Sequence, residues 1–161
     1  MTELRAGPHA DPHPESLRPH EQAVETPADF DAGVWFVGRI RTPWTRREDC
    51  PKRGDSENGP VCRIEIFEPW TPALAGVEEK ERLQILYWMH LSRRDAVRQN
   101  PNFGEGSIGT FAIRSPLRPN PIASSVVRLL AVEGSVLSVR GLDCLDGTPL
   151  IDVKPEFGVF T

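Results

Sequence analysis

The chain has 161 residues, of which 39% are apolar, and a formal net charge of -4 at neutral pH. This length and apolar content are sufficient for one domain with a single core and no disulfide bonds. Three widely spaced cysteines without a CxxC pair argue against a disulfide framework or a zinc site. No apolar run reaches membrane-spanning length, and the first residues lack a signal-peptide pattern. We therefore expect a soluble, cytoplasmic protein.

The first 32 residues differ in composition from the rest of the chain. They hold seven acids and two arginines, net -5, whereas residues 33–161 carry 17 bases and 16 acids, net +1. The segment is rich in proline, alanine and acids and has no helical or strand periodicity, which predicts a disordered tail over residues 1–32. Its histidines, His9, His13 and His20, lack carboxylate or thiolate partners at fixed geometry, so we expect no metal site.

From residue 33 onward, the pattern is one of short strands. Val61 to Phe67 alternates between apolar and charged residues, as a strand with one buried face does, whereas Leu83 to Leu91 is apolar on both faces. Glu133-Gly134 and Asp146-Gly147 predict tight turns. The expected strands cover residues 34–40, 61–67, 83–91, 108–114, 122–132, 135–142 and 149–153. Seven short strands with almost no helix predict an all-β domain over residues 33–161, a single-sheeted antiparallel β-barrel.

The most informative segment is the run Phe111 to Ile122 (FAIRSPLRPNPI). Its three prolines fix φ and bias the residues before them toward extended geometry, so that polar side chains project in set directions. A rigid loop with two guanidinium groups is suited to binding an anionic or planar ligand. Taken alone, the run also fits a proline-rich surface connection with incidental arginines.

One further motif points elsewhere. Residues 104–109 spell GEGSIG, a literal G-x-G-x-x-G. The dinucleotide-binding fingerprint needs a strand before the glycines and a helix after them, whereas this run follows Asn-Pro-Asn and leads into a predicted strand. We therefore interpret it as a flexible loop.

Four segments together resemble one family, the tRNA N6-threonylcarbamoyladenosine methyltransferases (TrmO, also called TsaA-like or YaeB-like). They are GRIRTP at 38–43, LQILYWMH at 83–90, FAIRSPLRPNPI at 111–122 and LDCLDGTPLIDVKP at 142–155. The resemblance implies a β-barrel, usually a homodimer, that binds S-adenosylmethionine without a Rossmann fold. It also implies methylation of N6 of the modified adenosine at tRNA position 37, beside the anticodon.

Carried over by position, the resemblance implies a cofactor site built from four places in the chain. A sulfonium cation favours a carboxylate such as Asp143, and the methionine carboxylate favours arginine. The acceptor nitrogen must lose a proton, and Asp143 and His90 both remain candidates to take it. The implied cofactor-binding residues are Pro51, Lys52, Arg53, His90, Leu91, Arg114, Ser115, Leu142, Asp143, Cys144 and Leu145.

Recognition of tRNA needs guanidinium groups for phosphates and aromatic platforms for unstacked bases. The arginines assigned to RNA are Arg93, Arg94 and Arg118, with Trp44, Arg46 and Arg47 as further candidates. The chain departs from the family pattern at Leu91, Ile113, Ala123 and Ser124. A second function therefore stays open: a barrel that binds S-adenosylmethionine but methylates another small acceptor or only senses the cofactor.

Overall fold

The computed structural model describes residues 17–157, so the first half of the predicted tail lies outside the described residues. The chain divides into two compact units. Among the described residues, the barrel unit comprises residues 31–90 and 122–157, and the inserted unit comprises residues 17–30 and 91–121. The domain predicted over residues 33–161 therefore spans the barrel unit and most of the inserted unit.

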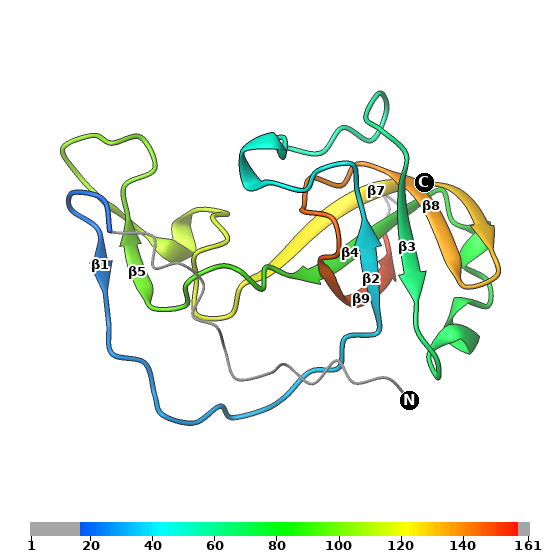
Figure 1. Ribbon diagram of the computed structural model, residues 1–161, viewed down its shortest axis with the longest axis horizontal. Helices are drawn as coiled ribbons and strands as arrows, with labels where there is room; N and C mark the ends of the chain where they lie inside the picture. Colours follow the sequence, from blue (N-terminus) through cyan, green and yellow to red (C-terminus); the bar gives the residue numbers. More distant parts are fainter. Residues whose placement is uncertain (1–16, 158–161) are drawn as a thin grey trace. The chain divides into compact units, whose positions relative to one another are not determined.

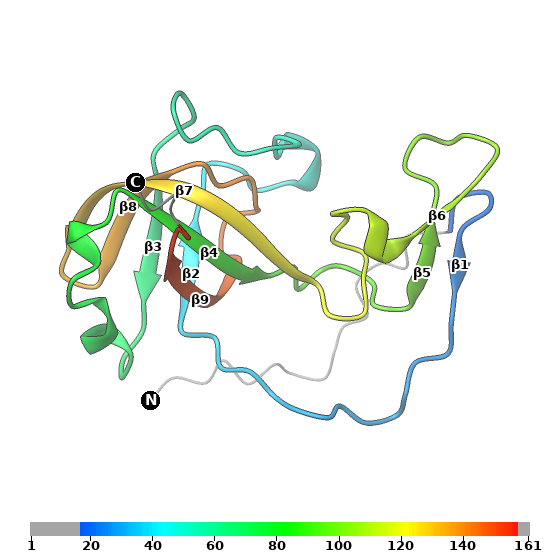
Figure 2. The ribbon, with the colours of Figure 1, turned by 180° about the vertical axis from the view of Figure 1, so that it is seen from behind.

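Six antiparallel strands close the barrel in the order β2-β3-β8-β7-β4-β9. Figures 1 and 2 show β7 beside β4 and β2 beside β3. Their bounds are β2 (Gly38–Arg41), β3 (Cys62–Ile66), β4 (Arg82–Trp88), β7 (Ile122–Glu133), β8 (Val136–Arg140) and β9 (Pro149–Pro155). The predicted antiparallel barrel is confirmed. It has six strands rather than seven, because residues 108–114 contribute only the two-residue β6 (Ile108–Gly109), which lies in the inserted unit.

The barrel core comes from alternate residues of these strands. On β3, Cys62, Ile64 and Ile66 are buried, and on β4 Leu83 and Ile85 are buried. The residues between them on β4 are half-buried, which explains why this strand is apolar on both faces. Because β9 pairs with both β2 and β4, the barrel leaves no open edge between these strands.

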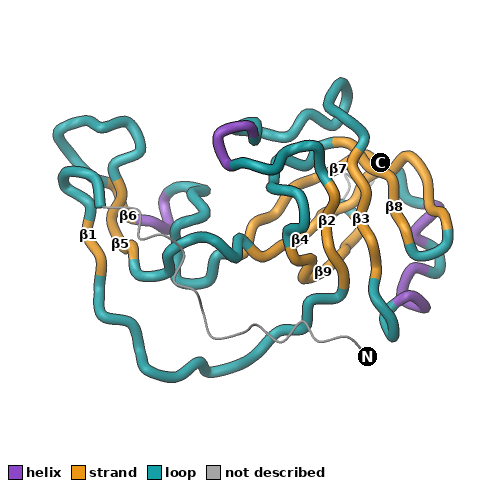
Figure 3. Tube along the Cα trace, in the orientation of Figure 1, coloured by secondary structure: helices purple, strands orange, loops and turns teal. Residues whose placement is uncertain are grey.

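Two of the predicted turns are present where expected. Gly134 has φ +61° and connects β7 to β8, and Gly147 has φ +82° in the turn that precedes β9. Positive φ is strained for residues with a Cβ, so glycine suits both places. The helices of the described residues are single 3-10 turns, at Arg47–Asp49, Thr71–Leu74, Val77–Glu79 and Thr110–Ala112 (purple in Figure 3). None of these described helices is long and apolar enough to cross a membrane.

The inserted unit contains a small sheet that composition did not predict. Its strands are β1 (Gln22–Ala23), β5 (Ala96–Gln99) and β6, in the order β1-β5-β6. Residues 22–23 were expected in the disordered tail, and in this part the prediction is wrong. The reason is that β5 offers an unpaired edge to which the N-terminal segment adds, whatever its own hydrophobicity.

Side chains reinforce this pairing within the inserted unit. The Glu21 carboxylate accepts a hydrogen bond from the backbone N–H of Asn100 at 2.9 Å, and the Asn100 amide donates to the Pro19 carbonyl at 2.9 Å. The guanidinium of Arg18 lies 4.2 Å from the ring centroid of Phe103. Residues 17–23 are therefore attached to the inserted unit by side chains as well as by backbone.

Truncation tests whether this segment is structural. We expect removal of residues 1–32 to speed hydrogen exchange at the amides of β5, since their β1 partners would be lost. Removal of residues 1–16 alone serves as the control and should leave these amides protected. Equal protection in both truncated chains would contradict the structural role of residues 17–32.

Candidate functional site

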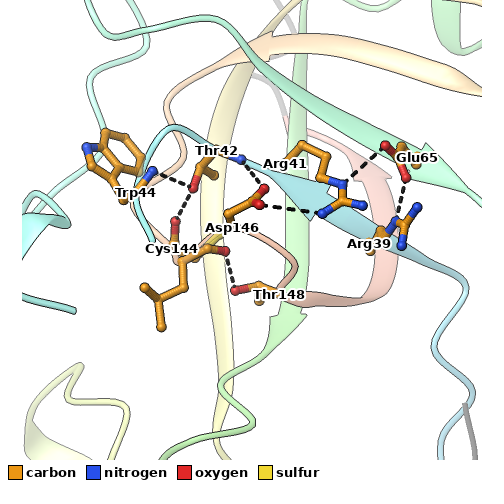
Figure 4. A network of polar contacts seen from close by, with 9 residues as sticks. Arg39, Arg41, Thr42, Trp44, Glu65, Cys144, Asp146 and Thr148 are labelled. Carbon is orange, nitrogen blue, oxygen red and sulfur yellow. Dashed lines mark hydrogen bonds and ion pairs between the residues drawn. The ribbon is translucent and has the colours of Figure 1, made fainter. Parts of the chain in front are cut away.

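The first and last matched motifs meet in the barrel unit. The backbone N–H of Thr42 donates to the Asp146 carboxylate at 3.1 Å, and the Thr42 hydroxyl donates to the Cys144 carbonyl at 2.8 Å (Figure 4). The backbone N–H of Asp146 donates to the Trp44 carbonyl at 2.7 Å. We call residues 142–148, which lead into β9, the closing segment. Four of its members belong to the predicted cofactor site, and these contacts fix their backbone.

Asp143 is held from the opposite side, by β4. The hydroxyl of Tyr87 donates to the Asp143 carboxylate at 2.7 Å and lies 2.7 Å from the Ser125 hydroxyl. Tyr87 is only 2% exposed, and burial, followed by the nearby Asp143 charge, raises the pKa of its phenol far above the ordinary value. The phenol therefore stays protonated and donates its hydrogen bond to Asp143, so Ser125 donates to the phenol oxygen. The hydrogen bonds from Ser125 to Tyr87 and from Tyr87 to Asp143 orient the Asp143 carboxylate.

The loop Pro51–Arg53 lies beside the closing segment. It is exposed, and Gly54, which follows it, packs on the end of β8: a Cβ on Gly54 would lie 1.8 Å from the Gly141 carbonyl oxygen. Cys50, which precedes the loop, is close enough to Asp143 for that carboxylate to contribute, after burial, to a raised thiol pKa. The structure thus brings together two of the predicted cofactor-binding groups, Pro51–Arg53 and Leu142–Leu145.

His90 ends the barrel unit two residues after β4. Its side chain is largely exposed, while the imidazole nitrogen is partly desolvated, which lowers the pKa of the ring below its ordinary value; a hydrogen bond to the Trp88 backbone opposes this shift. The imidazole is therefore neutral near pH 7 and able to accept a proton. Within the described residues, no hydrogen bond joins His90 to Asp143.

The two buried cysteines of the barrel are not nucleophiles. Burial raises the pKa of the Cys144 thiol to about 12 and that of Cys62 to about 11. Both thiols stay protonated and behave as small apolar groups. What Cys144 offers to neighbouring groups is its backbone carbonyl, which already accepts from Thr42.

The proline-rich run forms a braced loop within the inserted unit. The Arg118 guanidinium donates to the carbonyls of Ile113, Ser115 and Thr110 at 3.2 to 3.4 Å. The buried Gln99 amide donates to the Leu117 carbonyl at 2.6 Å. The loop is therefore held by side chains as well as by its prolines. It presents the predicted cofactor residues Arg114, which is exposed, and Ser115, and Leu91 begins the same unit as another exposed residue.

The arginines assigned to RNA have structural partners. Arg93 forms an ion pair with Asp95 at 2.6 Å and lowers the pKa of that carboxyl. Arg94 donates to the Pro119 carbonyl at 2.6 Å and lies 4.6 Å from the Phe30 ring centroid. Arg118 braces the proline-rich loop. All three side chains thus stabilise the inserted unit, and their contact with RNA stays a prediction.

Sequence reasoning missed several residues of this site. Tyr87 and Ser125 orient Asp143, and Thr42 and Asp146 fix the closing segment. One signal was available: Tyr87 is the only tyrosine of the chain and lies in an apolar strand, where a buried hydroxyl needs a partner. The identity of that partner, 56 residues away, was not readable from the pattern.

A substitution at Gly54 tests the packing of the loop on β8. In Gly54→Ala, the new methyl group would collide with the Gly141 backbone. We therefore expect the free energy of unfolding to fall by roughly 1 to 3 kcal/mol and the melting temperature by roughly 3 to 10 °C. Gly33→Ala is the control, because nothing lies within 4 Å of a Cβ there. If both variants melted like the parent, the loop would not be packed as described.

Comparison with known proteins places these motifs in one family. Residues 39–159 match the family model of the tRNA-methyltransferase O N-terminal domain. VirR of Rhizobium radiobacter, named as a probable S-adenosyl-L-methionine-binding protein, is 54% identical over 89% of this chain and 82% of its own. A Methanothermobacter thermautotrophicus protein with the same description is 39% identical over 81% of this chain and 93% of its own.

A solved structure supports the same family assignment. The crystal structure of TrmO from Pseudomonas aeruginosa aligns with a TM-score of 0.65 and 28% identity. The alignment covers 82% of this chain and 61% of the TrmO chain. This chain therefore spans about three fifths of the length of that solved relative.

Proposed function

Because the chain belongs to the family of the tRNA-methyltransferase O N-terminal domain, the TrmO family, we propose that it is an S-adenosylmethionine-dependent tRNA methyltransferase. The proposed acceptor is N6 of N6-threonylcarbamoyladenosine at tRNA position 37. The observation that carries the proposal is the Asp143 carboxylate, fixed by the buried Tyr87 hydroxyl beside the loop Pro51–Arg53. An oriented, partly buried carboxylate suits a ligand with a positive centre.

The residues of the barrel unit fit this cofactor. When bound, S-adenosylmethionine supplies a methyl group whose carbon is activated by the positive sulfur. Asp143 would balance that positive charge, and the Tyr87 hydrogen bond keeps the carboxylate in one orientation. Arg114, which belongs to the inserted unit, carries a guanidinium of the kind that a methionine carboxylate favours. The remaining task of the chain is to align the acceptor nitrogen and exclude water.

We assign the two candidate catalytic groups to different tasks. Asp143 would have its charge opposite the sulfonium when the cofactor is bound, and protonation would remove that interaction. His90 is neutral near pH 7 because its pKa is lowered, so it can take the proton from the acceptor nitrogen. Below the lowered pKa the imidazole would be charged, and methylation would be lost as the pH falls.

Two substitutions separate these tasks. Asp143→Asn should weaken cofactor binding roughly 10- to 150-fold, as expected for the loss of one charge-assisted contact. His90→Gln should leave the cofactor Kd nearly unchanged and lower kcat by roughly 10² to 10⁴. Calorimetry gives the first quantity and single-turnover methylation the second. If Asp143→Asn lost rate at unchanged affinity while His90→Gln kept its rate, the assignment would be reversed.

The function itself is tested with cofactor and tRNA. We expect saturable binding of S-adenosylmethionine in calorimetry, and we expect tRNA from cells lacking the gene to lose the methylated nucleoside in mass spectrometry. Absence of heat at millimolar cofactor would overturn the proposal.

A homodimer is part of the proposal, since the inserted unit leaves Phe103 and Phe111 68% and 84% exposed. Analytical sedimentation measures the oligomeric state.

A second function is favoured by the name of one relative. VirR is described by cofactor binding rather than by a reaction. The alternative is a barrel that binds the cofactor and methylates another small acceptor or only senses it. Cofactor binding together with unchanged tRNA nucleosides would select this alternative.

A further inference from the structure

The outward face of strands β2 and β3 carries charge that the proposed cofactor site does not use. Alternate residues of these strands point into the core, and those between them, Arg39 and Arg41 on β2 and Arg63 and Glu65 on β3, point outward. We call these four residues the β2–β3 outer face. Arg39, Arg41 and Glu65 are drawn in Figure 4. None of the four belongs to the predicted cofactor or RNA contacts.

The charges on this face are unevenly paired. Glu65 accepts from the guanidinium groups of both Arg39 and Arg41, and Arg41 also reaches Asp146 at 3.4 Å. Arg63 lies directly opposite Arg41 in the strand register, and the described residues give it no ion pair. Like charges directly opposite each other destabilise a sheet. An anion bound between Arg63 and Arg41 would remove this repulsion.

A shallow, open hollow lies at this place. Its volume is about 580 Å³, and its charged lining residues are Arg41 and Arg63 together with the carboxylates Glu65 and Asp146. Both carboxylates pair with Arg41, so Arg63 is the lining arginine without an ion pair among the described residues; Ser138 also lines the hollow. Ser138 stands opposite Arg63 in the pairing of β3 with β8. A guanidinium and a hydroxyl side by side are typical donors to phosphate oxygens. The hollow contains none of the predicted cofactor-binding residues, and it borders the closing segment at Thr42 and Asp146.

An aromatic platform lies at the other end of the same strand pair. Trp35 precedes β2, and Trp70 follows β3; their ring centroids are 5.5 Å apart. Trp70 packs against the core, whereas Trp35 is 75% exposed. An exposed indole that is held by a second indole is a stacking surface with one orientation.

We propose that this surface binds single-stranded RNA, with one base stacked on Trp35 and backbone phosphate held by Arg63, Arg41 and Ser138. The proposal rests on the proposed function, because it locates the RNA substrate on this chain. The stretch from Trp35 to Arg41 covers roughly 20 Å at strand spacing, which is longer than one nucleotide. Glu65 holds Arg39 and Arg41 in place, so little side-chain entropy is lost on binding.

Single-stranded RNA explains both ends of the surface. Free phosphate would account for Arg63 but not for the exposed indole, and an apolar protein partner would account for Trp35 but not for the opposed arginines. Stacking platforms combined with a positive groove are the usual means of binding single strands. Such a mode suits an RNA loop, whose bases are unstacked.

The test uses the full chain and a fluorescently labelled single-stranded RNA of 12 nucleotides, with anisotropy measured over a range of salt. Trp35→Ala should weaken binding roughly 5- to 150-fold without changing the salt dependence. Arg63→Ala should reduce the slope of log K against log salt by about one. Arg128→Ala is the matched control: it removes the same charge from β7, where Glu57 pairs it at 3.1 Å, and should bind RNA like the parent.

Three results would overturn the proposed RNA site. The first is RNA binding at the parental level by both Trp35→Ala and Arg63→Ala. The second is a change of sedimentation in Trp35→Ala without loss of RNA binding, which would mark Trp35 as a contact between copies of the chain. Weakening by Arg128→Ala equal to that by Arg63→Ala would reduce the effect to net charge and also overturn it. Cofactor calorimetry and tRNA methylation on the same preparations test the proposed function separately. RNA binding lost in both variants of a protein that methylates no tRNA would uphold this site alone.

Discussion

The closing of the barrel by β9 is the constraint on which the site depends. Since β9 pairs with β2 on one side and β4 on the other, the segment that enters it must pass between the ends of these strands. Thr42, just after β2, and Tyr87, on β4, then reach the closing segment from two sides. A barrel with an open edge between β2 and β4 would leave Asp143 without a fixed position.

Burial sets the protonation of the titratable groups in the barrel core. The phenol of Tyr87 and the thiols of Cys62 and Cys144 all have raised pKa values, chiefly because burial disfavours their charged forms. They are neutral donors or apolar groups at physiological pH. The negative charge at this end of the barrel therefore comes from a carboxylate rather than from a thiolate or phenolate, which suits a site for a cation.

The sequence predicted the parts of the fold that depend on local pattern. Alternation located β3, glycine located the turns at Gly134 and Gly147, and short strands without helices predicted a barrel. Pairing at long range was not predictable. Nothing local marks Gln22 and Ala23 as a strand, because their partner β5 is more than 70 residues away in the chain and contributes backbone groups that every sequence shares.

The same limit applies to side-chain roles. An arginine that braces a loop and one that holds a phosphate are identical in the sequence, so Arg93, Arg94 and Arg118 were assigned to RNA by position and type. Their partners in the structure are carbonyls and a carboxylate of the same unit. Arg63, by contrast, stands in an ordinary alternating strand, and only the register against Arg41 shows that its charge is opposed by another.

The outer face and the closing segment are connected at Asp146, which pairs with Arg41, yet Asp143 has its own support. Asp146 faces outward to Arg41, while Asp143, three residues before it, faces Tyr87. The closing segment does not rely on Arg41, because backbone bonds to Thr42 and Trp44 also hold Asp146. An anion bound beside Arg63 and Arg41 would therefore leave Asp143 in place. RNA could occupy the outer face while the carboxylate remains oriented for its own ligand.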